Sequence, residues 1–154
     1  SVPYNPLWAA RKPRSAFLMS LAGPLANLAL ALAAWSLMAL GLRTGVFVPG
    51  LFAGVNALVA PAHSGAVGSI AATVVDVMFR LNLVLFVFNL IPLPPMDGSE
   101  VWYLFIGREE ERFRWKRLFA SYSLIGILVA WRLFPRLFEP VFLAFLNALY
   151  RFAG

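Results

Sequence analysis

The sequence predicts an all-α membrane protein, a polytopic bundle of transmembrane helices with a proline-rich break after the second span. Three observations predict this class. Hydrophobic residues make up 61% of the 154 residues and charged residues only 13%, about half the usual share of a soluble domain. Residues 15–42 and 69–91 form two apolar runs, each as long as the ~20 residues that a span needs. The basic residues gather at the ends of such runs, as they do when they set topology.

The first run follows a short segment, residues 1–14, which contains three prolines and no helical periodicity. We expect this segment at the cytoplasmic surface and a first span over 15–42. Gly23-Pro24 lies inside the span, so either the helix kinks there or Gly23 allows a neighbouring helix to approach. Four alanines extend a small-residue face suited to tight helix packing: Ala22, Ala26, Ala29 and Ala33.

Asn27 is the only amide of the first run. One interpretation is an interhelical hydrogen bond within the bundle. The other places Asn27 beside an active site, where it orients a ligand or a substrate. The residues of this run leave both open.

Residues 43–68 are apolar but interrupted by seven glycines and prolines, so they cannot form one straight span. We expect a loop with a short re-entrant or interfacial helix near 51–60. The chain's one histidine, His63, lies in this loop. A zinc site built on His63 needs a second histidine, so we expect His63 to have no catalytic role.

The second span, 69–91, contains Asp76 and Arg80, which are four residues apart and therefore share a helix face. We predict a structural ion pair that lowers the cost of each charge in lipid. A proton or substrate path is the alternative. Asn82 and Asn89 also share one face, and we expect this polar stripe to point toward the interior of the bundle.

The stretch from Asn89 to Gly98 breaks the helical pattern. Pro92, Pro94 and Pro95 remove three backbone donors, and such a segment at membrane depth is tolerated only inside protein or along a wet cavity. Asp97 closes the stretch. An ionisable residue among apolar neighbours at membrane depth is a candidate functional residue.

The distribution of charged residues divides the chain after residue 14 into three predicted regions. Residues 15–106 form the predicted membrane core, and residues 107–117 are a densely charged connector. Residues 118–154 are predicted as C-terminal hydrophobic helices, 118–131 and 137–152, arranged as a hairpin or as one span followed by an interfacial helix.

The distribution of charge also constrains orientation and partners. Basic residues at 11–14 and 108–117 place both segments in the cytoplasm and the 43–68 loop outside. The net charge of +6 is explained by this pattern, so we expect no nucleic-acid partner; the expected partner is the lipid bilayer. The chain has no cysteine, which excludes disulfides.

Asn89-x-x-Pro92-x-Pro94-x-x-Asp97-Gly98 resembles the second signature of the site-2 protease family of intramembrane zinc metallopeptidases. The resemblance implies a zinc cofactor, with Asp97 as the third metal ligand. It implies transmembrane peptide substrates, and it casts Asn27, Asn89, Pro92 and Pro94 as groups that bind substrate or orient a ligand.

Two further segments are similar to the same family. Gly23-Pro24-x-x-Asn27 matches its Gly-Pro-x-x-Asn helix, and Val2-Pro3-Tyr4-Asn5-Pro6 is similar to the short segment before that helix. The three segments occur in the family's order, and the resemblance covers roughly residues 2–101.

The family's first two zinc ligands and its general-base glutamate belong to an H-E-x-x-H helix, which these 154 residues lack. We therefore expect no catalytic residue in this chain and interpret it as the C-terminal part of a longer polypeptide in a bacterial-type plasma membrane. Two alternatives stay open. One is a non-catalytic relative that binds partner helices through the face from Ala22 to Ala33. The other is a transport protein with Asp76, Arg80 and Asp97 along a polar path.

Overall fold

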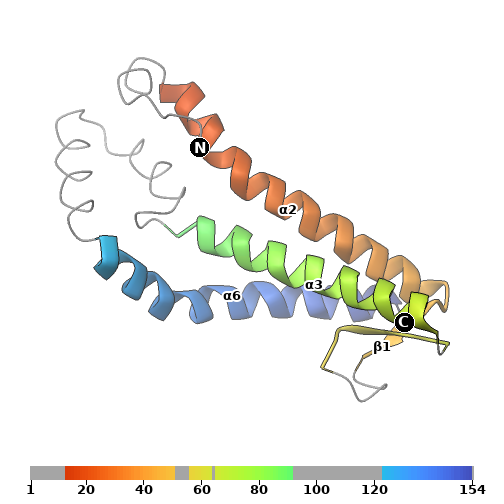
Figure 1. Cartoon of the computed structure of the whole chain (residues 1–154). Helices are drawn as coiled ribbons and strands as arrows, with labels where there is room; N and C mark the ends of the chain where they lie inside the picture. Colours follow the sequence, from red (N-terminus) through yellow and green to blue (C-terminus); the bar gives the residue numbers. More distant parts are fainter. Residues whose placement is uncertain (1–12, 51–55, 64, 92–122, 154) are drawn as a thin grey trace. The chain divides into compact units, whose positions relative to one another are not determined.

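The computed structural model describes residues 13–50, 56–63, 65–91 and 123–153 (Figure 1). Within them are three helices, α2 (Pro13–Arg43), α3 (Ala66–Asn89) and α6 (Ser123–Ala153). Between α2 and α3 lie two short strands, β1 (Phe47–Pro49) and β2 (Val59–Pro61). The described chain is mostly helical, as predicted, but it contains a strand pair that an all-α fold does not.

The chain packs as two compact units. The first comprises Ser1–Ala26 and Phe86–Pro135, and the second comprises Asn27–Leu85 and Arg136–Gly154. Each of the three helices contributes to both units, while the strand pair belongs entirely to the second.

Helix α2 begins at Pro13, where the missing N–H of proline costs no hydrogen bond. It ends at Arg43 because Gly45 turns left-handed, with φ of 74°. The Thr44 hydroxyl donates to the Leu40 carbonyl (2.9 Å) and so satisfies part of the last turn. Pro24 lies within the helix and is fully buried. The helix therefore continues through Gly23-Pro24.

Helix α3 covers the predicted second span with its start shifted from residue 69 to Ala66. It ends at Asn89, two residues earlier than predicted, where the Ile91 N–H donates to the Phe88 carbonyl in a tight turn (3.2 Å). The next residue in the sequence is Pro92, which disfavours a helical conformation at Ile91. The proline-rich break itself lies outside the described residues.

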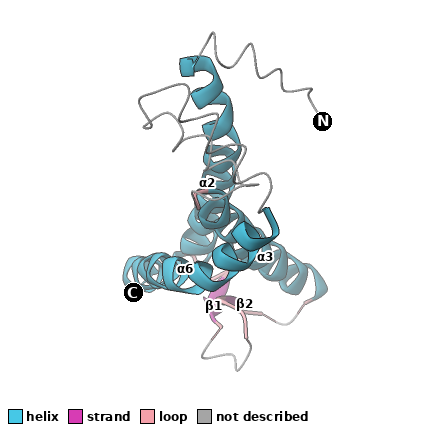
Figure 2. Cartoon of the chain, turned by 90° about the vertical axis from the view of Figure 1, so that its left-hand side faces the viewer, coloured by secondary structure: helices cyan, strands magenta, loops and turns pink. Residues whose placement is uncertain are grey.

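Strands β1 and β2 form an antiparallel hairpin, seen side by side in Figure 2. Val48 pairs with Ala60, and this pair is flanked by hydrogen bonds from Gly50 N–H to the Leu58 carbonyl (3.0 Å) and from Ala62 N–H to the Val46 carbonyl (3.0 Å). The short helix expected near 51–60 is therefore wrong for residues 56–60. β-Branched and aromatic residues next to Pro-Gly favour strands here over a helix.

The C-terminal region is one helix, α6, where two were predicted. Pro135 and Pro140 lie inside it, and each leaves the carbonyl four residues earlier without its helical donor. An open connection would leave more backbone groups unpaired in an apolar environment, so continuing the helix costs less.

Each unit has its own packed centre. In the second unit it includes Met38, Phe79, Leu83 and Leu149, each at most 1% exposed. In the first, Ile91 and Ala130 are buried against the rings of Phe88 and Phe134, whose centroids lie 5.8 Å apart.

The predicted alanine face of α2 is not the buried one. Ala22, Ala26, Ala29 and Ala33 are all exposed, whereas Ala31 and Ala34 are buried. The exposed faces of helices α2 and α3 also carry many large apolar side chains. Leu37 and Leu40 on α2, and Ile70 and Leu81 on α3, are each more than half exposed. Such surfaces are typical of helices in lipid.

Helices α2 and α3 are long and apolar enough to cross a membrane. The qualifying stretches are Leu21–Arg43 and Ala66–Asn89, with mean hydropathies of 1.9 and 2.0.

Candidate functional site

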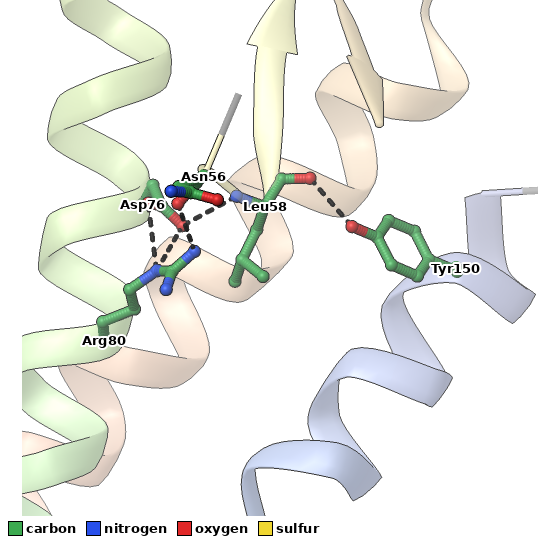
Figure 3. A network of polar contacts seen from close by, with 5 residues as sticks. All are labelled: Asn56, Leu58, Asp76, Arg80 and Tyr150. Carbon is green, nitrogen blue, oxygen red and sulfur yellow. Dashed lines mark hydrogen bonds and ion pairs between the residues drawn. The ribbon is translucent and has the colours of Figure 1, made fainter. Parts of the chain in front are cut away.

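The described polar side chains concentrate where α3 meets the hairpin, in the second unit (Figure 3). Asp76 and Arg80 are one helical turn apart on α3, and Arg80 Nε lies 3.0 Å from both carboxylate oxygens of Asp76. The Asp76 side chain is 10% exposed and that of Arg80 39%. The predicted ion pair is confirmed, and it is a partly buried one.

Both members of the pair also bind the hairpin backbone. Leu58 N–H donates to Asp76 Oδ1 (3.2 Å), and Arg80 Nη2 donates to the Asn56 carbonyl (3.2 Å). The carboxylate thus accepts from a backbone donor just before β2, while the guanidinium donates to a carbonyl two residues earlier. The pair satisfies backbone groups that the two-stranded ladder leaves unpaired.

Helix α6 also contacts the hairpin, through Tyr150. The Tyr150 hydroxyl donates to the Leu58 carbonyl (3.0 Å), the same carbonyl that accepts from Gly50. Leu58 is 6% exposed, and its N–H and C=O contact α3 and α6 respectively. In Figure 3 Asp76 and Tyr150 approach Leu58 from opposite sides.

Aromatic rings pack beneath the ion pair. The Arg80 guanidinium lies 5.9 Å from the centroid of the Phe142 ring, within cation–π range. Phe79 contacts Phe142 and, edge-on, Phe145, with centroids 6.3 and 5.7 Å away. Trp35 of α2 adds a hydrogen bond from its indole Nε1 to the Phe145 carbonyl (3.0 Å).

The polar side chains of this cluster have a structural role. Its carboxylate is neutralised and hydrogen-bonded, and its phenol is engaged with a backbone carbonyl. Among the residues that the structure describes, no group of three or more His, Cys, Asp or Glu is arranged to hold a metal ion. The described contacts of the cluster anchor the hairpin to α3 and α6.

The structure describes only two of the five site residues predicted from the sequence. Asp97, Pro92 and Pro94 fall outside the described residues. Asn27 is half-buried on α2 in the second unit, and Asn89 is half-buried at the end of α3 in the first. Neither amide makes a hydrogen bond with the described part of the chain, so their roles stay predictions.

The other two predicted polar residues are clearer. Asn82 is 8% exposed, and its side-chain amide donates to the Met78 carbonyl of its own helix (2.8 Å). His63 is exposed in the loop after β2.

Sequence reasoning missed the hairpin anchors. Tyr150 belongs to no recognisable motif of the sequence, and the backbone groups of Asn56 and Leu58 carry no signal of their own. The usable signal was the pair of runs Val46–Pro49 and Leu58–Pro61, each an apolar run closed by proline.

Comparisons with known proteins place these elements in context. The family model of peptidase family M50 matches residues 4–133. YwhC of Bacillus subtilis (strain 168), provisionally named a zinc metalloprotease, is 36% identical over 96 residues. That match covers 59% of this chain and 35% of YwhC, so the matched part of the chain spans about a third of that relative's length. No solved structure matches the chain.

Proposed function

Because the chain belongs to peptidase family M50, the site-2 protease family, we propose that it is part of an intramembrane zinc metalloprotease. The reaction is hydrolysis of peptide bonds within transmembrane segments. The match over residues 4–133 carries this proposal, since it contains both apolar helices and the Asn89–Gly98 stretch. The proposed substrate is a transmembrane peptide, and the protein is proposed to lie in the lipid bilayer.

Within that function, Asp97 is the residue through which this chain contacts the metal. Asn27, Asn89, Pro92 and Pro94 are proposed to bind substrate or to orient a ligand. Asn27 and Asn89 are both half-buried on apolar helices, α2 and α3.

The described residues alone do not fit a zinc centre, because they contain no group of three ligand side chains. A catalytic zinc needs three protein ligands and an open position. The 154 residues contain no H-E-x-x-H, and the match covers 35% of YwhC. We therefore propose that two imidazole ligands and the general base come from the rest of the polypeptide.

The test compares two carboxylates three residues apart in the complete protein. Asp97→Asn should abolish most proteolysis of a transmembrane substrate and lower bound zinc, because a neutral amide is a weak zinc ligand. Glu100→Gln is the matched control, with the same loss of charge close by, and should keep both. Metal content of the purified protein is measured beside cleavage, and circular dichroism of the same sample separates loss of zinc from loss of fold. Full cleavage with Asp97→Asn would refute the assignment.

The same measurement applies to the 154-residue chain by itself. We expect less than stoichiometric zinc and no cleavage, and we expect both to appear when a span containing H-E-x-x-H is joined to it. Stoichiometric zinc in the short chain, lost on Asp97→Ala, would show that the ligands are elsewhere.

The transport alternative is disfavoured by the geometry of the ion pair. Asp76 and Arg80 are occupied by each other and by the backbone of Asn56 and Leu58. A proton or substrate path requires these groups to exchange partners, which would release the hairpin.

A further inference from the structure

Strand β2 runs alongside α3, in the direction opposite to the helix. A side chain placed on Gly68 would meet the Pro61 ring at 3.2 Å, Leu58 binds Asp76, and Asn56 binds Arg80. From Gly68 to Arg80 the helix rises about 18 Å at 1.5 Å per residue. From Pro61 back to Asn56 there are five residues, which reach at most about 17 Å. The three contacts occur in reverse order along α3, so the chain before and through β2 runs antiparallel beside the helix.

This alignment carries the hairpin far from the start of α3. Arg80 lies fourteen residues after Ala66, which is about 21 Å along the helix axis. The hydrocarbon core of a bilayer is about 30 Å thick. A helix that uses Ala66–Asn89 to span therefore holds Arg80, and with it Asn56, inside the hydrocarbon region.

Non-helical backbone at that depth needs its polar groups satisfied. The described hairpin meets this need in two ways. Asp76, Arg80 and Tyr150 bind the backbone at Leu58 and Asn56. Pro49 and Pro61 occupy the pairs between the hydrogen-bonded ones, where a backbone N–H would point away from the partner strand. Proline removes that donor altogether.

The low exposure of the hairpin residues is consistent with a position inside the membrane. Leu58, Val59 and Ala60 are 1–6% exposed, and Phe47 is 7% exposed. The Phe47 ring lies against Gly41 of α2, where an added Cβ would approach ring atoms to 2.2 Å. The hairpin is thus held by α2, α3 and α6 within one unit.

We propose that strands β1 and β2, with residues 56–58 before β2, lie within the membrane as a re-entrant β-hairpin, and that Asp76, Arg80 and Tyr150 are the side chains that fix it there. The charged pair in α3 then serves the hairpin backbone. This inference concerns topology and stands independently of zinc binding or proteolysis.

The test uses single cysteines, because the sequence has none of its own. Asn56→Cys and His63→Cys both replace exposed side chains, and the Asn56 contact to Arg80 uses only the backbone. The protein itself therefore does not shield either thiol. In open membrane sheets, a membrane-impermeant maleimide should label position 56 roughly tenfold more slowly than position 63, because water is excluded from the hydrocarbon region.

A second readout measures depth directly. A bimane at position 56 should be quenched in phosphatidylcholine vesicles brominated deep in the acyl chains, and a bimane at position 63 should not be. Equal labelling at the two positions, or no quenching at position 56, would overturn the re-entrant hairpin.

The anchoring role is tested in the Asn56→Cys background. Tyr150→Phe keeps the ring and removes the bond to Leu58, and it should raise labelling at position 56 roughly fivefold, the effect of one lost hydrogen bond on a local opening equilibrium. Trp35→Phe is the control, since it removes an α2–α6 bond that does not touch the hairpin. Unchanged labelling with Tyr150→Phe, or an equal rise with Trp35→Phe, would overturn this role.

Discussion

Arg80 Nε lies 3.0 Å from each carboxylate oxygen of Asp76, and the same carboxylate accepts the N–H of Leu58, eighteen residues earlier in the chain. The pair therefore joins a helix to a hairpin as well as neutralising two charges within an apolar span. Loss of this pair should lower the free energy of unfolding more than it lowers proteolytic activity.

Asp76→Asn keeps the shape and one acceptor oxygen but leaves Arg80 without a counter-charge. Breaking a fully buried pair costs about 3–5 kcal/mol, and since Arg80 is 39% exposed we expect about 2 kcal/mol here. Unfolding in detergent, followed by circular dichroism, measures it.

The control is Thr73→Val, which removes a hydroxyl bonded only to its own helix and should change the free energy of unfolding little. Proteolysis by the complete protein should survive Asp76→Asn at temperatures where it stays folded. Loss of activity at unchanged stability would favour the proton-path interpretation.

Gly50→Ala should disrupt the hairpin. A Cβ at Gly50 would lie 1.9 Å from the Ala57 carbonyl oxygen, so the backbone has to move. Overpacking of this kind costs about 1–3 kcal/mol. Gly65→Ala is the matched control, because a Cβ there meets nothing within 4 Å. Comparable melting temperatures for the two variants would contradict the close approach at Gly50.

Phe79→Ala should open a cavity between α3 and α6, since Phe79 is 1% exposed and contacts Phe142 and Phe145. In water this change costs about 3–5 kcal/mol. In lipid the transfer part is reduced, so we expect about 2 kcal/mol, mostly lost packing. Leu81→Ala, at a side chain that is 54% exposed, should be near neutral in the same unfolding measurement.

Orientation is predicted by the basic clusters. Residues 108–117 should face the cytoplasm, and the 43–68 loop should be connected to the outside, from which its hairpin enters the membrane. A cysteine at His63 should react with an impermeant reagent in intact cells, and a cysteine at Arg112 only after the membrane is opened. The reverse labelling pattern would show that the predicted orientation in the membrane is wrong.

The two long apolar helices α2 and α3 were predictable because each is a long apolar run, a signal that does not depend on the rest of the fold. The pairing of Asp76 with Arg80 followed from helical spacing alone. The hairpin was not predictable in the same way. Its residues are as apolar as those of a helix of equal length, and the side chains that hold it, Asp76, Arg80 and Tyr150, are distant in sequence.

The buried face of α2 shows the same limit. Alanines at 22, 26, 29 and 33 suggested a packing face, yet Ala31, Ala34 and Met38 are the buried residues. In an apolar helix nearly every face is compatible with burial, so composition cannot identify which side meets protein and which meets lipid. For the candidate site, motif resemblance identified the family while Asp97 remains a prediction.

Pro49 and Pro61 have one more consequence. Exposed strand edges invite pairing with other chains, which is a common route to aggregation while a protein is being inserted or assembled. Each outer edge of this two-stranded sheet carries a proline where an incoming strand would need an N–H donor. A third strand cannot continue the ladder past either position, so both edges of the hairpin resist pairing with another chain.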